Sequence, residues 1–176
     1  MSWEVSLFDW NKKGADGFVV GSERVISLLS ASTEEEATAA YWKLDGVVCM
    51  NGVAYDGALS VVQTILCHLP NCSKYSKFRC LELLGQISVC ESDSESPDVV
   101  LKCLEEMKQF SWGFLHGLQF DSPENAWLYV DLVGVLGERF ADFKNKAIIY
   151  LECVLSRNLP NNDIEMIENT LEELKT

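Results

Sequence analysis

The sequence contains no uncharged apolar run of about 18 residues, which is the length that crosses a bilayer as a helix. It has only two histidines, His68 and His116, so side chains that exchange protons near neutral pH are scarce. G-x-S-x-G, P-loop, dinucleotide-binding and H-E-x-x-H motifs are all missing. We therefore expect neither a membrane protein nor an enzyme of the common classes, and we expect both histidines to be structural.

Positive charge is also scarce. The chain has 14 Lys and Arg against 27 Asp and Glu, a net charge of -13 at pH 7. The basic residues are scattered, and their densest group is Lys74, Lys77 and Arg79. Nucleic acids and anionic membranes need a cationic stripe, so neither is an expected partner. Such a surplus of carboxylates favours a basic protein as partner, whereas the simpler interpretation is a solvated acidic surface that maintains solubility.

Cysteine is present as seven residues, an odd number, and most lie within helical patterns where cysteine acts as a small buried hydrophobe. We expect no disulfide-linked dimer. Since no signal peptide opens the chain either, we expect a reducing, cytoplasmic location. Cys67, His68, Cys72 and Cys80 are close in sequence but lack a second C-x-x-C or H-x-x-x-H half. No metal and no cofactor are predicted.

Two long apolar helices organise the chain. Apolar residues recur at helical spacing over 53–69 and again over 74–90. Pro70 and the turn at 71–73 separate them, so the two helices must pack antiparallel. Each is apolar over more than half its circumference and needs helical neighbours on two sides. This requirement is typical of stacked helical hairpins.

The rest of the chain continues the pattern. Helices are also expected over about 22–30, 33–50, 97–119, 122–140, 145–157 and 163–174. The prediction is an all-α fold of about eight helices in antiparallel hairpins, stacked as a short HEAT/armadillo-like superhelix within a single domain, 1–176. The alternative fold is a compact irregular bundle. Residues 1–21 are interpreted as an N-terminal cap, with a short hairpin as the alternative.

Aromatic and acidic residues gather around the Asn51-Gly52 turn. Asp45 and Asp56 flank this turn, accompanied by Tyr41, Trp42 and Tyr55. Aromatic rings beside carboxylates can hold an arginine or lysine by stacking and hydrogen bonding. In the alternative interpretation Trp42 lies in the core and the acids are merely solvated. A second acidic group, Glu91, Asp93 and Glu95, lies in a hydrophilic loop that precedes Pro97.

Three segments carry a resemblance to a known family. They are A-Y-W-K-L-D-G-V-V at 40–48, N-G-V-A-Y-D-G-A at 51–58 and L-E-L-L-G-Q-I at 81–87. This region resembles the HEAT-like immunity proteins of bacterial contact-dependent growth inhibition systems, which are polymorphic toxin systems. In size and acidity the chain is most similar to the all-helical immunity protein paired with a basic, RNase A-like toxin domain.

The resemblance implies a non-enzymatic inhibitor that binds its cognate toxin domain one-to-one in the cytosol of the producing cell. The carboxylates would cover the toxin's cationic, RNA-binding cleft, and opposite charges would speed association. The predicted partner-binding residues are Tyr41, Trp42, Asp45, Tyr55, Asp56, Glu91, Asp93 and Glu95. The first five lie within the family pattern, whereas the three loop acids are chosen on charge alone.

Two other function classes remain open at this point. A HEAT-type adaptor or scaffold for another basic protein would show the same acidic surface. An enzyme on a helical scaffold, such as a glycosylase or a chromophore lyase, would need a basic groove or a ligand cavity. The sequence offers no basic groove.

Overall fold

The computed structural model describes residues 3–157 and 159–176, and over this range the fold is all-α, as predicted. The α-helices are α1 (Ser22–Leu29), α2 (Glu34–Val48), α3 (Ala58–His68), α4 (Lys74–Ser88), α5 (Val99–Gln109), α6 (Ser111–Phe120), α7 (Ala126–Arg139), α8 (Ala141–Val154) and α9 (Asn161–Lys175). Short 3-10 helices are η1 (Trp3–Leu7), η2 (Leu69–Asn71) and η3 (Pro123–Asn125). Strands of two residues each are β1 (Cys49–Met50), β2 (Val53–Ala54) and β3 (Glu91–Ser92).

Backbone packing divides the chain into two compact units, Met1–Met107 and Lys108–Thr176, called here the N-terminal and C-terminal units. The single domain expected from the sequence stays a prediction. Among the described residues, no helix combines the length and the apolar character that crossing a membrane requires.

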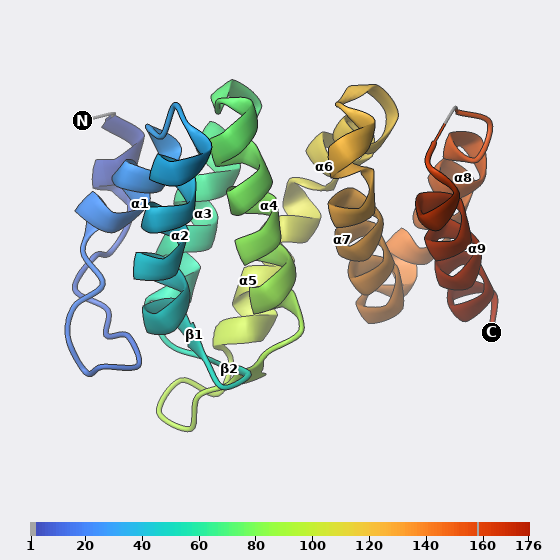
Figure 1. Cartoon of the computed structure of the whole chain (residues 1–176). Coiled ribbons are helices and arrows are strands. Elements are labelled where there is room, and N and C mark those ends of the chain that lie inside the picture. Colours follow the sequence, from blue (N-terminus) through green and yellow to red (C-terminus); the bar gives the residue numbers. More distant parts are fainter. Residues whose placement is uncertain (1–2, 158) are drawn as a thin grey trace. The chain divides into compact units, whose positions relative to one another are not determined.

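In the N-terminal unit α1 packs against α2, α3 and α4, and α2 also packs against α4 (Figure 1). The core between them is aliphatic; Leu28, Leu44, Ile65, Leu81 and Leu84 are completely buried. The helix starts follow from local chemistry. Thr33 caps α2 by accepting the N–H of Glu36, and Ser73 caps α4 by accepting that of Ser76.

In the C-terminal unit α7 is the central helix and packs against α6, α8 and α9. Glycines allow this close packing. A Cβ on Gly117 would collide with the Tyr129 ring, and one on Gly137 would press against Leu174 of α9. In both units nearly every helix buries one broad apolar face against its neighbours.

The described residues contain one α-helix more than the sequence suggests, because the helix expected over 97–119 is broken at Phe110. The Phe110 backbone leaves the helical region, with φ -86° and ψ 2°, and its ring packs edge-on against Phe114 with 5.3 Å between centroids. Gly113 makes room for the ring, since a Cβ there would clash with it. The break therefore depends on ring packing, which helical periodicity does not show.

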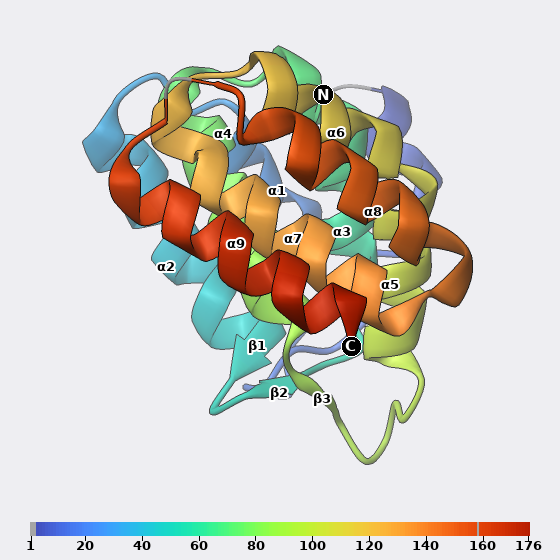
Figure 2. The same cartoon turned by 90° about the vertical axis from the view of Figure 1, so that its right-hand side faces the viewer.

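The Asn51-Gly52 turn was expected to end one helix and lead directly into the next. Instead it closes a β-hairpin between β1 and β2, with positive φ angles of 54° and 77° at its two central residues. Strand β2 then pairs in parallel with β3, in the register Val53↔Glu91. The three strands lie together at one end of the N-terminal unit (Figure 2). Consequently α3 begins at Ala58 rather than at Val53.

The segment that precedes α1 is a loop held by main-chain hydrogen bonds rather than a regular hairpin. Lys13 and Val19 form one isolated antiparallel bridge. Ala15 N–H donates to the Val47 carbonyl at 2.8 Å, and Gly57 N–H donates to the Lys13 carbonyl at 3.1 Å. The segment therefore lies against the end of α2 and the start of α3. Residues 1 and 2 of the predicted cap lie outside the described residues.

The cysteines differ from expectation in two ways. Cys49 and Cys90 are buried, as expected of small hydrophobes in apolar patterns, but they form an intramolecular disulfide across 41 residues, which a reducing location does not predict. Cys67 and Cys153 are exposed rather than buried. Helical periodicity places these two near the edges of apolar faces, where a small side chain remains accessible to solvent. Cys103 is buried, as predicted.

Candidate functional site

The eight predicted partner-binding residues lie on two different surfaces of the N-terminal unit. Asp56 and the three loop acids lie at the strand-bearing end, whereas Tyr41, Trp42 and Asp45 lie on α2 where it packs against α4. Tyr55 is half-buried beside the hairpin, and its N–H donates to the Val48 carbonyl at 3.0 Å.

Parallel pairing of β2 with β3 is what brings the first group together. Glu91 N–H donates to the Gly52 carbonyl at 2.8 Å, and Asp93 N–H donates to the Ala54 carbonyl at 2.9 Å. The acidic loop therefore lies directly beside the segment that carries Asp56. We call the carboxylates gathered here the acidic end; they are Asp9, Asp56, Glu91, Asp93, Glu95 and Asp98.

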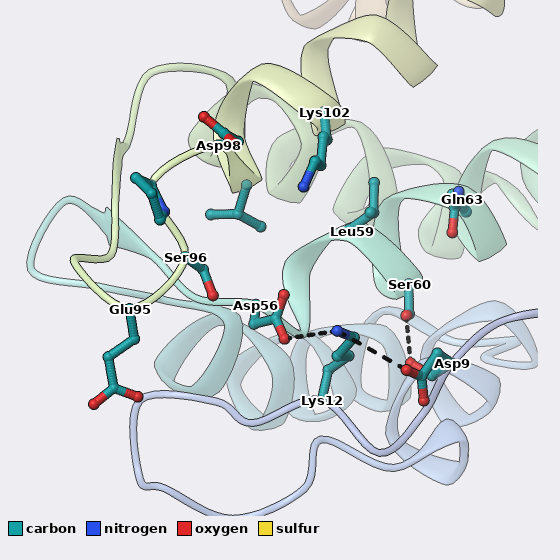
Figure 3. Close-up of a pocket in the computed structure, with 12 residues that line it drawn as sticks. Asp9, Lys12, Asp56, Leu59, Ser60, Gln63, Glu95, Ser96, Asp98 and Lys102 are labelled. Carbon is teal, nitrogen blue, oxygen red and sulfur yellow. Dashed lines mark hydrogen bonds and ion pairs between the residues drawn. The ribbon is translucent and has the colours of Figure 1, made fainter.

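The acidic end surrounds a cavity of about 410 Å³. Four of its carboxylates line this cavity, from Asp9, Asp56, Glu95 and Asp98, together with the ammonium groups of Lys12 and Lys102. Figure 3 shows Lys12 on the side of the N-terminal segment and Lys102 reaching in from α5, with Glu95 outward at the rim. Carboxylates outnumber ammonium groups, so the cavity favours a cation.

Lys12 is one of the two lysines that line this cavity, and it is paired with carboxylates. Its Nζ lies 3.1 Å from Oδ2 of Asp56 and 3.9 Å from Oδ2 of Asp9. The hydrogen bond to Asp56 raises the pKa of Lys12; the charges of Asp56 and Asp9 add to this effect, and desolvation opposes it. Ser60 Oγ donates to the Asp9 carbonyl at 2.6 Å and fixes this part of the wall.

The acidic loop is ordered by its own side chains. Asp93 Oδ2 accepts the N–H of Glu95 at 3.0 Å, and Ser92 Oγ accepts the N–H of Val100 at 3.1 Å. The second bond satisfies a donor in the first turn of α5. Glu91 and Glu95 are exposed, so their charges face solvent and any approaching partner.

The α2–α4 surface is built differently, around a buried tyrosine. Tyr41 is only 5% exposed, and its hydroxyl donates to Oε1 of Gln86 at 2.9 Å. Trp42 is 63% exposed, contrary to the alternative that placed it in the core. Its ring meets the Tyr41 ring edge-on, with 5.1 Å between centroids and 78° between planes. Tyr41 therefore supports the exposed indole from within the fold.

Asp45 lies one helical turn after Trp42 and is half-buried. Its Oδ1 is buried and has no hydrogen-bond partner among the described residues. Burial raises the pKa of Asp45; a hydrogen bond with Gln86 partly offsets this, and the charge of Glu82 adds to it. Arg79 of α4 pairs with Glu82 at 2.6 Å and donates to Thr38 Oγ1 at 3.0 Å.

Among the described residues, no three His, Cys, Asp or Glu side chains are placed to hold a metal ion together. His116 is exposed and contacts the Phe120 ring, and His68 is half-buried with an unpartnered Nε2. The cysteines close to His68 in sequence differ in exposure, since Cys67 is exposed and Cys80 is buried. Cys80 hydrogen-bonds Cys72, and this bond lowers the pKa of the Cys72 thiol to about 7. Neither histidine is fully buried in the core, and the structural role expected for both stays a prediction.

Sequence reasoning missed three of the residues that complete the cavity, namely Asp9, Lys12 and Lys102. Asp98, directly before α5, belongs by sequence to the same acidic loop but was not among the predicted partner-binding residues. Nothing in the sequence indicates that the Asp9–Lys12 segment meets α3, because no periodic pattern covers it.

Comparison of the chain with protein-family models, with curated proteins and with solved structures gave no match.

Proposed function

We propose that this protein is an immunity protein that binds a cognate basic toxin domain, a ribonuclease, one-to-one in the cytoplasm, and that it is not an enzyme. The observation that carries the proposal is the acidic end, where three chain segments far apart in sequence gather six carboxylates, four of which line one cavity. The sequence resemblance over residues 41–88 supports the same conclusion.

The physical basis is charge complementarity. A ribonuclease must present a cationic cleft to hold RNA phosphates. Carboxylates mounted on a fixed backbone compete for the same lysines and arginines, and the net charge of -13 steers the two proteins together. Fast association matters for an inhibitor whose target is already active when it arrives.

The experiment uses the C-terminal domain encoded immediately upstream, purified separately. RNA degradation by that domain is followed while this protein is titrated in, at low and at high salt. We expect protection that is complete at one equivalent, with association several-fold faster at low salt. Unchanged degradation, with no complex on a sizing column, would contradict the immunity function and would favour an adaptor for a different basic protein.

Charge-reversal variants locate the interface. Glu91→Lys combined with Glu95→Lys should slow association about tenfold or more, since each change replaces attraction by repulsion. Asp93 is left unchanged because its carboxylate holds the loop. The matched control is Glu168→Lys with Glu172→Lys, two exposed residues of α9, which changes the net charge equally. Equal slowing in both variants would mean that only overall charge matters and would remove the acidic end from the interface.

A further inference from the structure

The junction between η2 and α4 gathers thiol groups that the proposed function does not use. Cys72, Ser76 and Cys80 recur at intervals of four residues around the start of α4. The Cys72 thiol donates to the His68 carbonyl oxygen at 3.5 Å. The Ser76 Oγ lies 4.0 Å from the Cys80 Sγ, and the Cys80 thiol hydrogen-bonds the Cys72 sulfur. The two sulfur atoms are therefore hydrogen-bonded neighbours.

The two cysteines differ in their access to solvent. Cys72 is partly exposed, whereas Cys80 is completely buried. The hydrogen bond from Cys80 lowers the pKa of the Cys72 thiol to about 7; desolvation opposes this effect, and Ser76 and the charge of Lys77 add to it. The same bond, together with burial, raises the pKa of Cys80. At neutral pH the partly exposed thiol is thus substantially ionised, and the buried thiol stays protonated.

We propose that Cys72 and Cys80 form a dithiol that reduces a small hydroperoxide and is itself converted to an intramolecular disulfide. The Cys72 thiolate attacks one oxygen of the peroxide bond and becomes a sulfenic acid, while the other oxygen takes up a proton and leaves as an alcohol or as water. The Cys80 sulfur then attacks the Cys72 sulfur, and the hydroxyl group leaves with the Cys80 proton as water. The two thiols lose two electrons, and the peroxide gains them.

The arrangement of the two thiols suits both steps. Sensor cysteines are accessible thiolates that lie next to a second thiol, which intercepts the sulfenic acid before further peroxide oxidises it irreversibly. Cys72 lies between η2 and α4 on extended backbone, with φ -68° and ψ 149°, so it can approach Cys80 without unwinding an α-helix. Cys103 lacks these features, because it is buried and desolvation raises the pKa of its thiol to about 12.

The thiol pair lies away from the acidic end. Helix α3 begins and helix α4 ends beside the strands, so the junction between these helices lies at the opposite end of the N-terminal unit (Figure 1). The inference therefore does not rest on the proposed function, and either can fail without the other.

The test uses the full chain with Cys67→Ser and Cys153→Ser, which removes the two exposed cysteines. This protein is treated with hydrogen peroxide at neutral pH, quenched with catalase and denatured, and its thiols are counted and mapped by peptide mass spectrometry. We expect the loss of two thiols, a bond between Cys72 and Cys80, an unchanged Cys103 and full recovery with dithiothreitol. Thiols of Cys72 and Cys80 that both survive, or oxidation of Cys72 that stops at the sulfenic acid, would overturn the dithiol.

Single variants in the same background separate the two roles. In Cys80→Ala, peroxide should leave Cys72 as a sulfenic acid that dimedone traps, whereas Cys72→Ser should leave Cys80 unreactive. The pH midpoint for alkylation of Cys72 by iodoacetamide should be about 7 in the background protein and higher in Cys80→Ala, because the hydrogen bond to the thiolate is lost. An unchanged midpoint would show that the thiols do not act together and would overturn the proposal. The crosslink in the background protein decides the proposal even where Cys80→Ala does not fold.

Discussion

The ammonium group of Lys12 lies 3.1 Å from a carboxylate oxygen of Asp56, and this ion pair joins the N-terminal segment to the residues that precede α3. Both side chains are about 40% exposed, at 41% and 39%, so water screens the pair. A pair of this kind adds only about 0–1 kcal/mol to stability. Under the proposed function the pair matters more for recognition, because Lys12 occupies a position among carboxylates that a partner's cation would take.

Replacing Lys12 should therefore strengthen binding. Lys12→Met keeps most of the aliphatic stem and frees Asp56, so association with the basic domain should become several-fold faster at low salt. The free energy of unfolding should fall by no more than about 1 kcal/mol. Stopped-flow binding and urea unfolding measure the two effects. Lys146→Met, at an exposed position of α8, is the control for net charge. If both variants accelerate binding equally, Lys12 has no special position in the interface.

The hairpin turn should be sensitive to a single methyl group. Gly52 has φ +77°, and a Cβ there meets nothing within 4 Å, so Gly52→Ala introduces backbone strain and no steric clash. We expect a loss of about 1–2 kcal/mol in the free energy of unfolding. Gly46→Ala is the matched control, because its Cβ also meets nothing but lies within α2. That variant should gain roughly 0.5–1 kcal/mol. Effects of the same sign would contradict the hairpin geometry.

The disulfide between Cys49 and Cys90 should be detectable by counting thiols. The denatured protein should show five reactive thiols without reductant and seven after reduction. Reduction should lower the free energy of unfolding by roughly 3–4 kcal/mol, because the bond closes a long loop in the unfolded chain. The double variant Cys49→Ala, Cys90→Ala should be insensitive to reductant. Seven thiols before reduction would show that the bond is absent in solution.

The stability of Asp45→Asn should depend on pH. The folded protein raises the Asp45 pKa above its ordinary value of 3.8, chiefly through burial, so the ionised carboxylate opposes folding at neutral pH. The groups that face it are Gln86, the like charge of Glu82, and Arg79, which is paired with Glu82. Asp45→Asn should thus be more stable than the parent at neutral pH, and this advantage should vanish below about pH 3.8. Urea unfolding of both proteins across that range measures it. An advantage that does not depend on pH would have a cause other than this carboxylate.

The helical class and many helix starts could be predicted because their causes are local. Thr33 followed by Glu36, and the apolar spacing of α4, act within a single turn of chain. The break at Phe110 was missed because it depends on ring packing against Phe114 rather than on a proline or a cap. Asn51-Gly52 was assigned to the wrong element because ending a helix and closing a hairpin both need positive φ.

The candidate site was predictable only in part, for the same reason. The loop acids follow from charge and turn composition alone. Their proximity to Asp56 depends on strands of two residues, which are too short to show alternation and whose partners are nearly 40 positions apart. The role of Lys12 depends on the path of the N-terminal segment, which is set by main-chain bonds such as that from Gly57 to the Lys13 carbonyl. Such main-chain hydrogen bonds cannot be read from the amino-acid sequence, because they do not depend on which side chains are present.

Because main-chain bonds fix the acidic loop, its conformation does not depend on the identity of its exposed side chains. Glu91 and Asp93 are anchored to Gly52 and Ala54 through backbone atoms, so exchanging the outward side chains of Glu91 and Glu95 leaves the anchoring bonds intact. Single substitutions at Glu91 and Glu95 can therefore change the charge of this surface without disturbing the main-chain bonds that hold the loop. The fold of the acidic loop therefore does not depend on which charges Glu91 and Glu95 carry.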